Sequence, residues 1–506
     1  MDHLRYEVTA TVHTDVLTNR TGLILMHPLS VCGRSVQVEH TDGRTSVSTF
    51  PVIVAPWPPF TLVRAVRHEY APGLWALCRL AGDDFELEDQ RNNADASFKT
   101  YSRSNLMPRP YLLRAGTVLR QSAELRLQSL PGAPRPGRKG PVTVALADGA
   151  VPWPSVGTAI AAADLSRAAA LEGLLATLAP AHIHLELERP DTPFNPASVA
   201  RVLAAAGGCV LRLQIICATA DVEPLRRIAC ALQGAGVVPF AVAVFPSTAP
   251  IVAAARQAFP GVRVGGGTPF FFTQLNRVED LAPVDFLAFT TASIVHGADD
   301  EEVMAGLQSL PAMIDTLRLR HGLVPVQTGP SSIGAPRRPL GGQPVSDGTR
   351  RLALARRDPR TCGLYGAAWA VGHVAQFAGA GVESITLFDL VGDAALVRPD
   401  GVTTPAFEVL RRLAAASSHR LLGIPQGVPL AGVALDGKSG GEVILANLGA
   451  RPLAVALQAT GMPAQARLMD AQSLLHRVEY PASPPWRLVD LQAGSIELPA
   501  YAVAFL

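Results

Sequence analysis

Hydrophobic positions in the first quarter of the chain alternate with polar ones in short runs that turn residues separate. A period of two places successive side chains on opposite faces of a strand. The predicted strands are residues 6–12, 35–38, 46–54, 74–80 and 118–127. We therefore predict an N-terminal β-sandwich-like domain over residues 1–135. Its end is marked by LPGAPRPGRKGP, residues 130–141, which holds four prolines and three glycines.

After residue 141 the pattern changes to apolar runs that alternate with stretches rich in alanine and leucine. The predicted strands are residues 142–147, 183–188, 210–217, 240–245, 262–265, 286–289, 324–327 and 384–388. The predicted helices are residues 155–178, 196–205, 224–235, 251–258, 302–320, 364–379 and 405–415. This alternation is typical of a parallel sheet covered by helices. The number of units over residues 141–418 fits a (β/α)8 TIM barrel, and a doubly wound open sheet is the alternative.

The helical period disappears again after residue 421. Short strands are predicted at residues 432–435, 442–447, 453–458, 465–469, 487–491 and 502–506, which indicates a C-terminal β domain over residues 421–506. The predicted fold class is therefore α/β, with a central (β/α)8 TIM barrel flanked by N-terminal and C-terminal antiparallel β domains.

Composition narrows the class of protein. Hydrophobic residues make up 48% of the 506-residue chain and charged residues 17%, which is typical of a globular protein rather than a disordered one. The net charge is only +2, and the sequence has no long run of basic residues of the kind that binds nucleic acid. A neutral or sugar-like ligand fits better. The cysteines show no CxxC spacing, so we predict buried free thiols rather than disulfides or a zinc cluster. They are Cys32, Cys78, Cys209, Cys217, Cys230 and Cys362.

No targeting or membrane segment is predicted. The N-terminus lacks a basic segment followed by an apolar one, so it does not resemble a secretory signal. Prolines 239, 246 and 250 interrupt the longest uncharged apolar run, residues 237–255, which favours a strand and a turn over a membrane span. We predict a cytoplasmic protein with no membrane or nucleic-acid partner, and the sequence predicts no oligomeric state.

The second predicted barrel strand, HIHLELER, carries ionisable side chains at every second position. His182, His184, Glu186 and Glu188 share one face, which points inward in a barrel and brings the two glutamates nearest the active rim. A carboxylate there can act as a general acid or base. An edge strand with its polar face in water is the alternative. The two histidines resemble a metal-binding HxH pair but lie at the amino end of the strand, so we predict no metal site.

The fifth unit, VGGGTPFFFTQLNR, follows its strand with glycines and hydrogen-bond donors. Three glycines let the backbone turn sharply and approach a ligand, and a tight turn alone is the alternative. Thr268, Asn276 and Arg277 supply the donors.

Two more predicted strand ends bring polar residues to the rim. His296, Asp299 and Asp300 follow the sixth strand, and one of the aspartates is explained as a helix N-cap. Asp389 ends the eighth strand, and Asp148 follows the first. The fourth strand ends in VFPST and the seventh in VQTGP, so neither carries the glutamate of a retaining glycosidase of this architecture.

The most polar stretch of the chain lies outside the predicted barrel. FELEDQRNNADASFKTY, residues 85–101, gathers charged and amide side chains at the end of the N-terminal domain. Its part EDQRNNADASFKTY, together with GGGTPFFFTQLNR, VHGADD and DPRTCGLYGAAWAVG in this order along the chain, resembles the D-apionate lactonase family. The resemblance implies a glycosidase-like TIM barrel flanked by β domains. It also implies hydrolytic ring opening of a branched five-carbon sugar-acid lactone, in apiose catabolism.

Two positions depart from the family pattern. Members carry a glutamate followed by a Thr-Thr-Gly-Trp-like stretch at the eighth strand, whereas this chain reads FDLVGD, in which Asp389 is one methylene shorter. Asn93 stands where an aromatic residue is expected. We expect both changes to reshape the pocket.

Lactone opening needs an activated water, a base and a group that stabilises the oxyanion. We assign the base to Glu186 or Asp389, with His296 as the alternative proton carrier. No metal or cofactor is required. Two alternatives stay open: a glycoside hydrolase of clan-A type, and a non-catalytic carbohydrate-binding protein.

Substrate-binding roles are assigned to residues from both predicted domains. We expect the polar stretch to close one wall of the site at the barrel mouth, with Arg91 and Lys99 polarising the lactone carbonyl and Glu88 or Asp89 binding hydroxyls. An exposed hairpin whose charges pair among themselves is the alternative. The remaining substrate-binding candidates are Glu188, Asn276 and Arg277.

Overall fold

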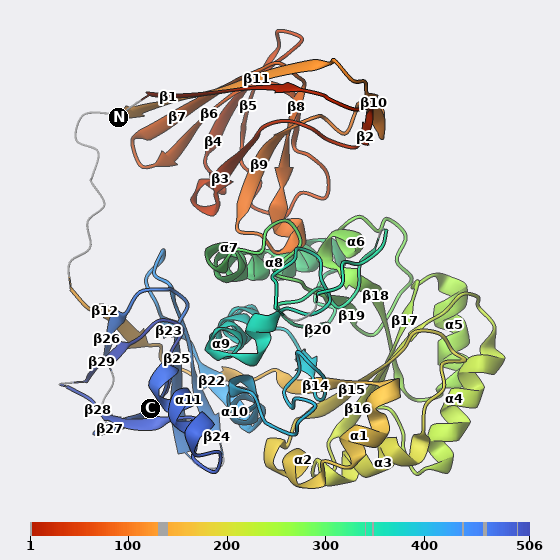
Figure 1. Cartoon of the computed structure of the whole chain (residues 1–506). Helices are drawn as coiled ribbons and strands as arrows, with labels where there is room; N and C mark the ends of the chain where they lie inside the picture. Colours follow the sequence, from red (N-terminus) through yellow and green to blue (C-terminus); the bar gives the residue numbers. More distant parts are fainter. Residues whose placement is uncertain are drawn as a thin grey trace. The chain divides into compact units, whose positions relative to one another are not determined.

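The computed structural model describes residues 3–129, 140–339, 341–346, 349–437, 440–458, 463–492 and 494–506. The chain folds as two compact units, Met1–Lys139 and Gly140–Leu506, each of which is described by itself (Figure 1). The proline-rich segment on which the predicted domain boundary rests falls largely at residues 130–139, outside the described residues.

The N-terminal unit is built almost entirely of antiparallel strands. Its elements are β1(His3–Thr11), β2(Val16–Thr18), β3(Ile24–Pro28), the 3-10 helix η1(Leu29–Val31), β4(Ser35–His40), β5(Thr45–Thr49), β6(Phe60–Ala71), β7(Leu74–Ala81), β8(Phe85–Asp89), η2(Gln90–Asn93), β9(Ser97–Ser102), β10(Tyr111–Leu113) and β11(Val118–Ser129). The described strands form a nine-stranded sheet and a β10–β2 pair. Alternate residues such as Val36, Val38, Phe85 and Leu87 form the core, as a period of two requires.

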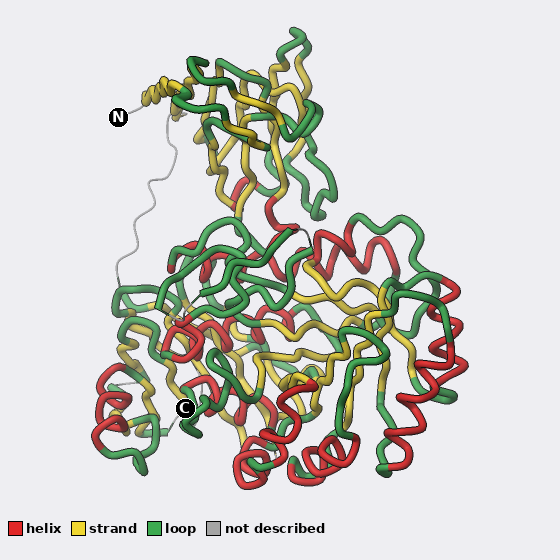
Figure 2. Tube along the Cα trace, turned by 45° about the vertical axis from the view of Figure 1, so that its right-hand side comes forward, coloured by secondary structure: helices red, strands yellow, loops and turns green. Residues whose placement is uncertain are grey.

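The second unit contains a closed barrel of eight parallel strands with helices around it (Figure 2). Its strands are β14(Ser155–Ala161), β15(His182–Leu187), β16(Val210–Ile216), β17(Ala241–Phe245), β18(Arg263–Phe271), β19(Leu287–Thr290), β20(Val326–Ser331) and β21(Ser384–Asp389). Its helices are η3(Ala162–Asp164), α1(Leu165–Ala169), α2(Glu172–Leu178), α3(Pro196–Ala205), α4(Val222–Gly234), α5(Ala249–Ala258), α6(Phe272–Asn276), α7(Asp300–Gly306), η4(Leu307–Ser309), α8(Leu310–His321), η5(Pro359–Cys362), α9(Leu364–Gly379) and α10(Pro405–Ala414). The barrel confirms the predicted fold class and excludes the open sheet.

The first barrel strand was predicted in the wrong place. Residues 155–178, predicted as one helix, form β14, a 3-10 turn and two short helices. The strand is rich in small residues because its neighbours approach closely: a Cβ on Gly157 would lie 2.2 Å from the carbonyl oxygen of His182. Alanine-rich composition therefore reports tight packing here rather than a helix.

The segment predicted as the first barrel strand belongs instead to the C-terminal β structure. The elements there are β12(Val142–Leu146), β13(Val151–Pro152), β22(Ala416–Arg420), β23(Leu422–Gly423), β24(Leu430–Gly437), β25(Gly440–Asn447), β26(Leu453–Gln458), β27(Gln465–Met469), α11(Ala471–Glu479), β28(Arg487–Asp490), β29(Ser495–Leu498) and β30(Val503–Phe505). Strand β12 pairs in parallel with β26 and antiparallel with β23, and Figure 1 shows it among the blue C-terminal strands. Asp148, which follows β12, is therefore not a barrel-rim residue.

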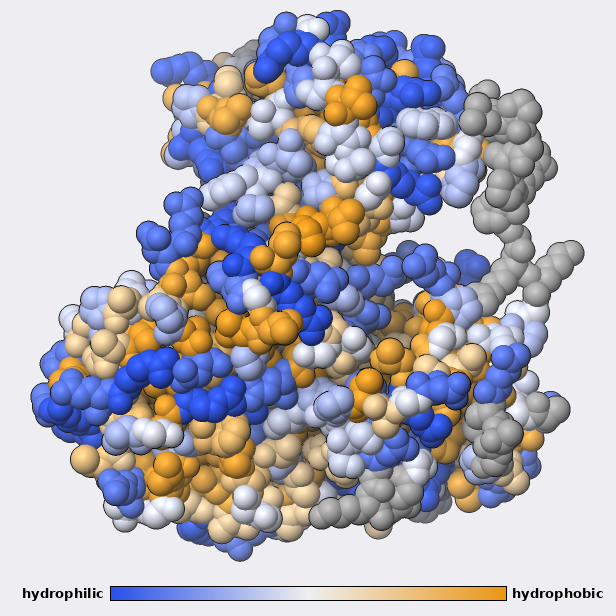
Figure 3. Space-filling model, turned by 180° about the vertical axis from the view of Figure 1, so that it is seen from behind, coloured by the Kyte–Doolittle hydropathy of each residue, from blue (hydrophilic) through white to orange (hydrophobic). Residues whose placement is uncertain are grey.

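The surface, the helices and the cysteines bear on the predictions made from composition. Hydrophobic and hydrophilic residues are interspersed over the face shown in Figure 3. None of the helices in the described ranges is long and apolar enough to cross a bilayer. All six cysteines are free thiols, as predicted, but only Cys78 and Cys217 are buried. Cys32, Cys209 and Cys362 are partly buried and Cys230 is exposed.

Candidate active site

Two carboxylates lie at the carboxyl end of the barrel on either side of strand β14. The parallel register pairs Ala161 of β14 with Glu186 of β15, and Ala159 of β14 with Asp389 of β21. Since the carboxyl ends of barrel strands form the active face, both side chains lie at the rim where catalysis takes place in TIM barrels. The strand HIHLELER is an interior member of the closed barrel, so the edge-strand alternative is wrong.

The Asp389 carboxyl is half-buried and accepts no hydrogen bond or ion pair from the described part of the chain. Burial raises the pKa of Asp389 above its ordinary value of 3.8. The charge of Glu186 raises this pKa further, whereas the Arg356 guanidinium opposes the shift. A carboxylate without partners and with a raised pKa is a stronger base than an ordinary one.

Glu186, in contrast, is held on both sides. Its carboxylate accepts hydrogen bonds from the Gln214 amide on β16 and from the Arg337 guanidinium in the loop after β20. The same Arg337 nitrogen lies 3.6 Å from the Glu188 carboxylate. Glu186 therefore anchors an arginine at the rim, and the rest of that guanidinium fork stays available as a donor.

The inward histidines of β15 lie deeper in the barrel. His182 forms hydrogen bonds through Nδ1 with the Ser155 hydroxyl at 2.9 Å and through Nε2 with the Thr386 hydroxyl at 2.8 Å. Burial, with the Arg212 charge added to it, lowers the pKa of His184 to about 3, so this imidazole is neutral at physiological pH. Within the described ranges no group of three or more His, Cys, Asp or Glu side chains could hold a metal ion.

The glycines of the fifth unit are explained by packing rather than by a ligand. They lie inside β18 instead of after it, and a Cβ on Gly265 would come within 2.1 Å of the Phe286 ring. Asn276 ends α6, is buried, and accepts a 2.9 Å hydrogen bond from Arg320 on its side-chain oxygen. This geometry favours a structural role for Asn276, in place of the predicted contact with sugar hydroxyls.

The segment after β19 is tied to the start of helix α9. Arg360 donates to the Asp358 carboxylate at 2.8 Å and to Asp300 at 2.8 Å, so two of the motifs quoted for the family resemblance are bonded to each other. Asp299 occupies the N-cap position of α7, but its side chain makes no capping hydrogen bond. His296 lies exposed in the same segment.

The polar stretch of the N-terminal unit contains a fully buried ion pair. Arg91 is 1% exposed, and its guanidinium donates to both oxygens of Asp89, at 2.9 and 2.7 Å. Further NH groups donate to the backbone carbonyls of Pro51 at 2.7 Å and Val52 at 2.9 Å. These contacts favour a structural role for Arg91 and Asp89 rather than the predicted contact with a lactone.

The rest of that stretch is paired as well. Lys99 forms an ion pair with Glu88 at 3.0 Å. Glu86, fully buried, accepts hydrogen bonds from Tyr101, from Ser104 at 2.9 Å and from the Asn105 amide at 2.8 Å. The charges therefore pair among themselves as in the alternative, but they do so buried in the unit and not in an exposed hairpin.

Three parts of the chain match domains of one family. Residues 1–130 match the D-apionate lactonase N-terminal domain, residues 156–418 the D-apionate lactonase TIM barrel domain, and residues 429–506 the D-apionate lactonase C-terminal immunoglobulin-like domain. The chain belongs to the D-apionate lactonase family. This confirms the family predicted from the four motifs, and with it the prediction of a lactone hydrolase.

A curated relative and two solved structures show the range of similarity. The D-apionate lactonase of Brucella anthropi is 34% identical over 431 residues, which cover 80% of this chain and 70% of the relative. A family 51 α-L-arabinofuranosidase from Bifidobacterium longum has a TM-score of 0.49 at 12% identity, over 72% of this chain and 99% of its own. A GH30 endoxylanase from Clostridium papyrosolvens has a TM-score of 0.45 at 12% identity, with the same two coverages.

Sequence reasoning missed two residues that shape the rim of this D-apionate lactonase family member. Gln214 lies two residues after Arg212 on β16, and the polar alternation of VLRLQII was a signal of inward-facing side chains. Arg337 lies in a long loop after β20, and long loops at the carboxyl face of a barrel are a place to look for functional residues. No periodicity in that loop predicts which arginine turns to Glu186.

Proposed function

We propose that the protein opens a sugar-acid lactone resembling D-apionolactone by adding water to its carbonyl carbon. Asp389 is the general base and Arg337 the oxyanion donor. The observation that supports the assignment is the contrast at the rim. Asp389 has a raised pKa and no hydrogen-bond or ion-pair partner among the described residues, whereas Glu186 is bound by Gln214 and Arg337. Membership of the D-apionate lactonase family supports the substrate class.

The reaction is expected to run in two steps. The Asp389 carboxylate takes a proton from water as the water oxygen attacks the carbonyl carbon, and the carbonyl oxygen becomes a tetrahedral oxyanion. Arg337 donates to that oxyanion, a contribution typically worth about 3 kcal/mol for one donor. The tetrahedral intermediate then breaks the ring C–O bond, and Asp389 returns its proton to the leaving alkoxide. The product is the open-chain hydroxy acid.

Glu186 has a positioning role in this scheme. Its carboxylate fixes Arg337 through a charge-assisted hydrogen bond, and Gln214 fixes Glu186 in turn. Glu188, 3.6 Å from the same arginine and mostly exposed, is placed to bind a substrate hydroxyl. Arg277 and His296 stay predictions as a hydroxyl ligand and an alternative proton carrier, and so do the contribution of Lys99 and Glu88 and the cytoplasmic location.

The reaction class is tested by incubating the purified protein with D-apionolactone and with four- and five-carbon aldonolactones, and by following acid release. We expect turnover of D-apionolactone and slower turnover of lactones that lack its branch. A folded protein that hydrolyses none of them contradicts the proposal.

The two alternatives predict different results in the same assay. A glycoside hydrolase would cleave aryl glycosides and ignore lactones. This outcome has less support, because neither β17 nor β20 carries a carboxylate at its carboxyl end in the described barrel. A binding protein would bind the sugar acid in calorimetry without forming product.

A further inference from the structure

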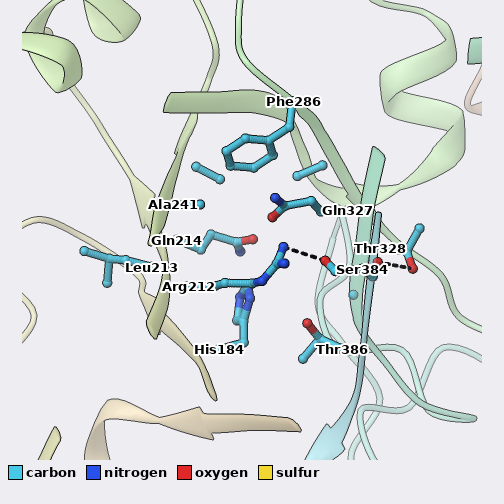
Figure 4. Close-up of a pocket in the computed structure, with 13 residues that line it drawn as sticks. His184, Arg212, Leu213, Gln214, Ala241, Phe286, Gln327, Thr328, Ser384 and Thr386 are labelled. Carbon is cyan, nitrogen blue, oxygen red and sulfur yellow. Dashed lines mark hydrogen bonds between the residues drawn. The ribbon is translucent and has the colours of Figure 1, made fainter. Parts of the chain in front are cut away.

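A small cavity lies inside the barrel below the rim. Its volume is about 10 Å³, which is the space of one water-sized group. Arg212, Gln214, Gln327 and His184 line it, together with the Phe286 ring, and Figure 4 shows these side chains converging on the barrel interior. These four polar side chains therefore come from three strands, β15, β16 and β20.

Three of the lining nitrogens, on Arg212, His184 and Gln327, have no hydrogen-bond partner in the described part of the chain. Arg212 is 4% exposed and donates one NH group to Ser384 at 2.6 Å, but its Nε has no partner within the described chain. His184 is 8% exposed, and its Nε2 is also unpartnered there. A buried donor without a partner costs about 1–3 kcal/mol, and more on a charged group, so these atoms point to an occupant of the cavity.

The charge around Arg212 favours an anion over water. Arg212 forms no ion pair with any described residue, and both inward histidines of β15 have strongly lowered pKa values. The carboxylate that acts on Arg212 electrostatically is Glu383, and Arg263 already binds both oxygens of that carboxylate. One positive charge is therefore left uncompensated inside the barrel, which is expensive in a buried site.

We propose that the cavity binds a monatomic anion, chloride in solution, between Arg212, His184 and Gln327. A cavity this small excludes a phosphate, a sulfate or a substrate carboxylate, and the charge of Arg212 favours a monatomic anion over a water. The bound halide is the missing counter-charge of Arg212 and a partner for its free NH group. This site is separate from the rim carboxylates and does not depend on the proposed lactone chemistry.

Thermal unfolding in sodium chloride and sodium bromide, compared with sodium methanesulfonate at the same ionic strength, tests the site. Because a ligand that binds only the folded state stabilises it with saturation, the midpoint should rise on the order of 2 °C further in the halides and then level off. The same rise in methanesulfonate would overturn the proposal. Bromide crystals should then show an anomalous peak within hydrogen-bond distance of Arg212, and an ordered water with no peak there would also overturn it.

A variant that carries its own counter-charge keeps the test independent of folding defects. Gln327→Glu places a carboxylate of the same shape at the cavity wall, so the variant should fold and lose the halide-specific rise. Gln233→Glu, on the exposed face of α4, makes the same change of charge away from the cavity and should keep the rise. A halide response unchanged in Gln327→Glu contradicts the assigned position.

Discussion

The polar stretch of the N-terminal unit and the rim of the barrel are both rich in ionisable side chains, but they use them in opposite ways. Asp89 is buried and its oxygens accept from Arg91 and from the Ala55 amide at 3.0 Å. Asp389 is half-buried and has no such partner in the described residues, and burial raises its pKa. The charge cluster of the N-terminal unit is therefore explained by its own pairing, whereas Asp389, unpaired among the described residues, makes the rim the candidate site.

The largest expected effect is on catalysis at the rim. Asp389→Asn removes the base without changing the shape of the side chain, so kcat should fall by about 10²- to 10⁴-fold. Steady-state hydrolysis of D-apionolactone measures it. Asp400→Asn, an exposed aspartate paired with Arg398, is the matched control and should leave kcat unchanged. Equal kcat values for the wild type and Asp389→Asn would contradict the role of Asp389 as the base.

The same substitution in the N-terminal unit should affect stability instead. Asp89→Asn leaves the buried Arg91 charge without its partner, which should lower the free energy of unfolding by about 3–5 kcal/mol. Urea unfolding followed by circular dichroism measures this change. Asp42→Asn breaks an exposed pair with Arg44 and should cost about 0–1 kcal/mol. A large fall in kcat with unchanged stability in Asp89→Asn would restore the catalytic role predicted for this segment.

The arginine anchored by Glu186 is expected to show an intermediate effect. Arg337→Gln removes the oxyanion donor, so kcat should fall about 10²-fold with a small change in KM. Arg338→Gln, its neighbour, which donates to the Gly342 carbonyl, should change kcat by less than about twofold. A change confined to KM would assign Arg337 to ground-state binding and contradict its role on the oxyanion.

The smallest expected effect is on the stability of Asp389→Asn, and it is opposite in sign to the effect of Asp89→Asn. The raised pKa of Asp389 means that the folded state favours the protonated form, so stability falls as the pH rises from 3.8 through that raised pKa. Asp389→Asn removes this cost and should slightly stabilise the protein at pH 7, with no gain below pH 3.8. Unfolding midpoints of both proteins across this range measure the difference. A variant less stable than the wild type at pH 7 would contradict the assigned environment of Asp389.

The sequence predicted the secondary-structure elements better than the side-chain pairs at the candidate site. The apolar period located seven of the barrel strands, and the alternation in HIHLELER placed Glu186 on the inner face. The pattern failed at β14. The strand is rich in small residues because His182 packs closely against it, and that composition was interpreted as a helix. The pairing of Asp89 with Arg91, two residues apart, was within reach of the sequence as the alternative for that stretch. The pairing of Glu186 with Arg337 was not, because it joins a strand to a loop 151 residues further along the chain.

The proposed role of Asp389 as general base can be tested by chemical rescue. Asp389→Ala leaves space at the rim, and added formate can take the place of the missing carboxylate as a base. If Asp389 is the base, formate should restore D-apionolactone hydrolysis at least about tenfold in Asp389→Ala and should not restore it in Glu186→Ala, where the anchor of Arg337 is lost. Rescue of Glu186→Ala with no response in Asp389→Ala would reverse the assignment and contradict the account.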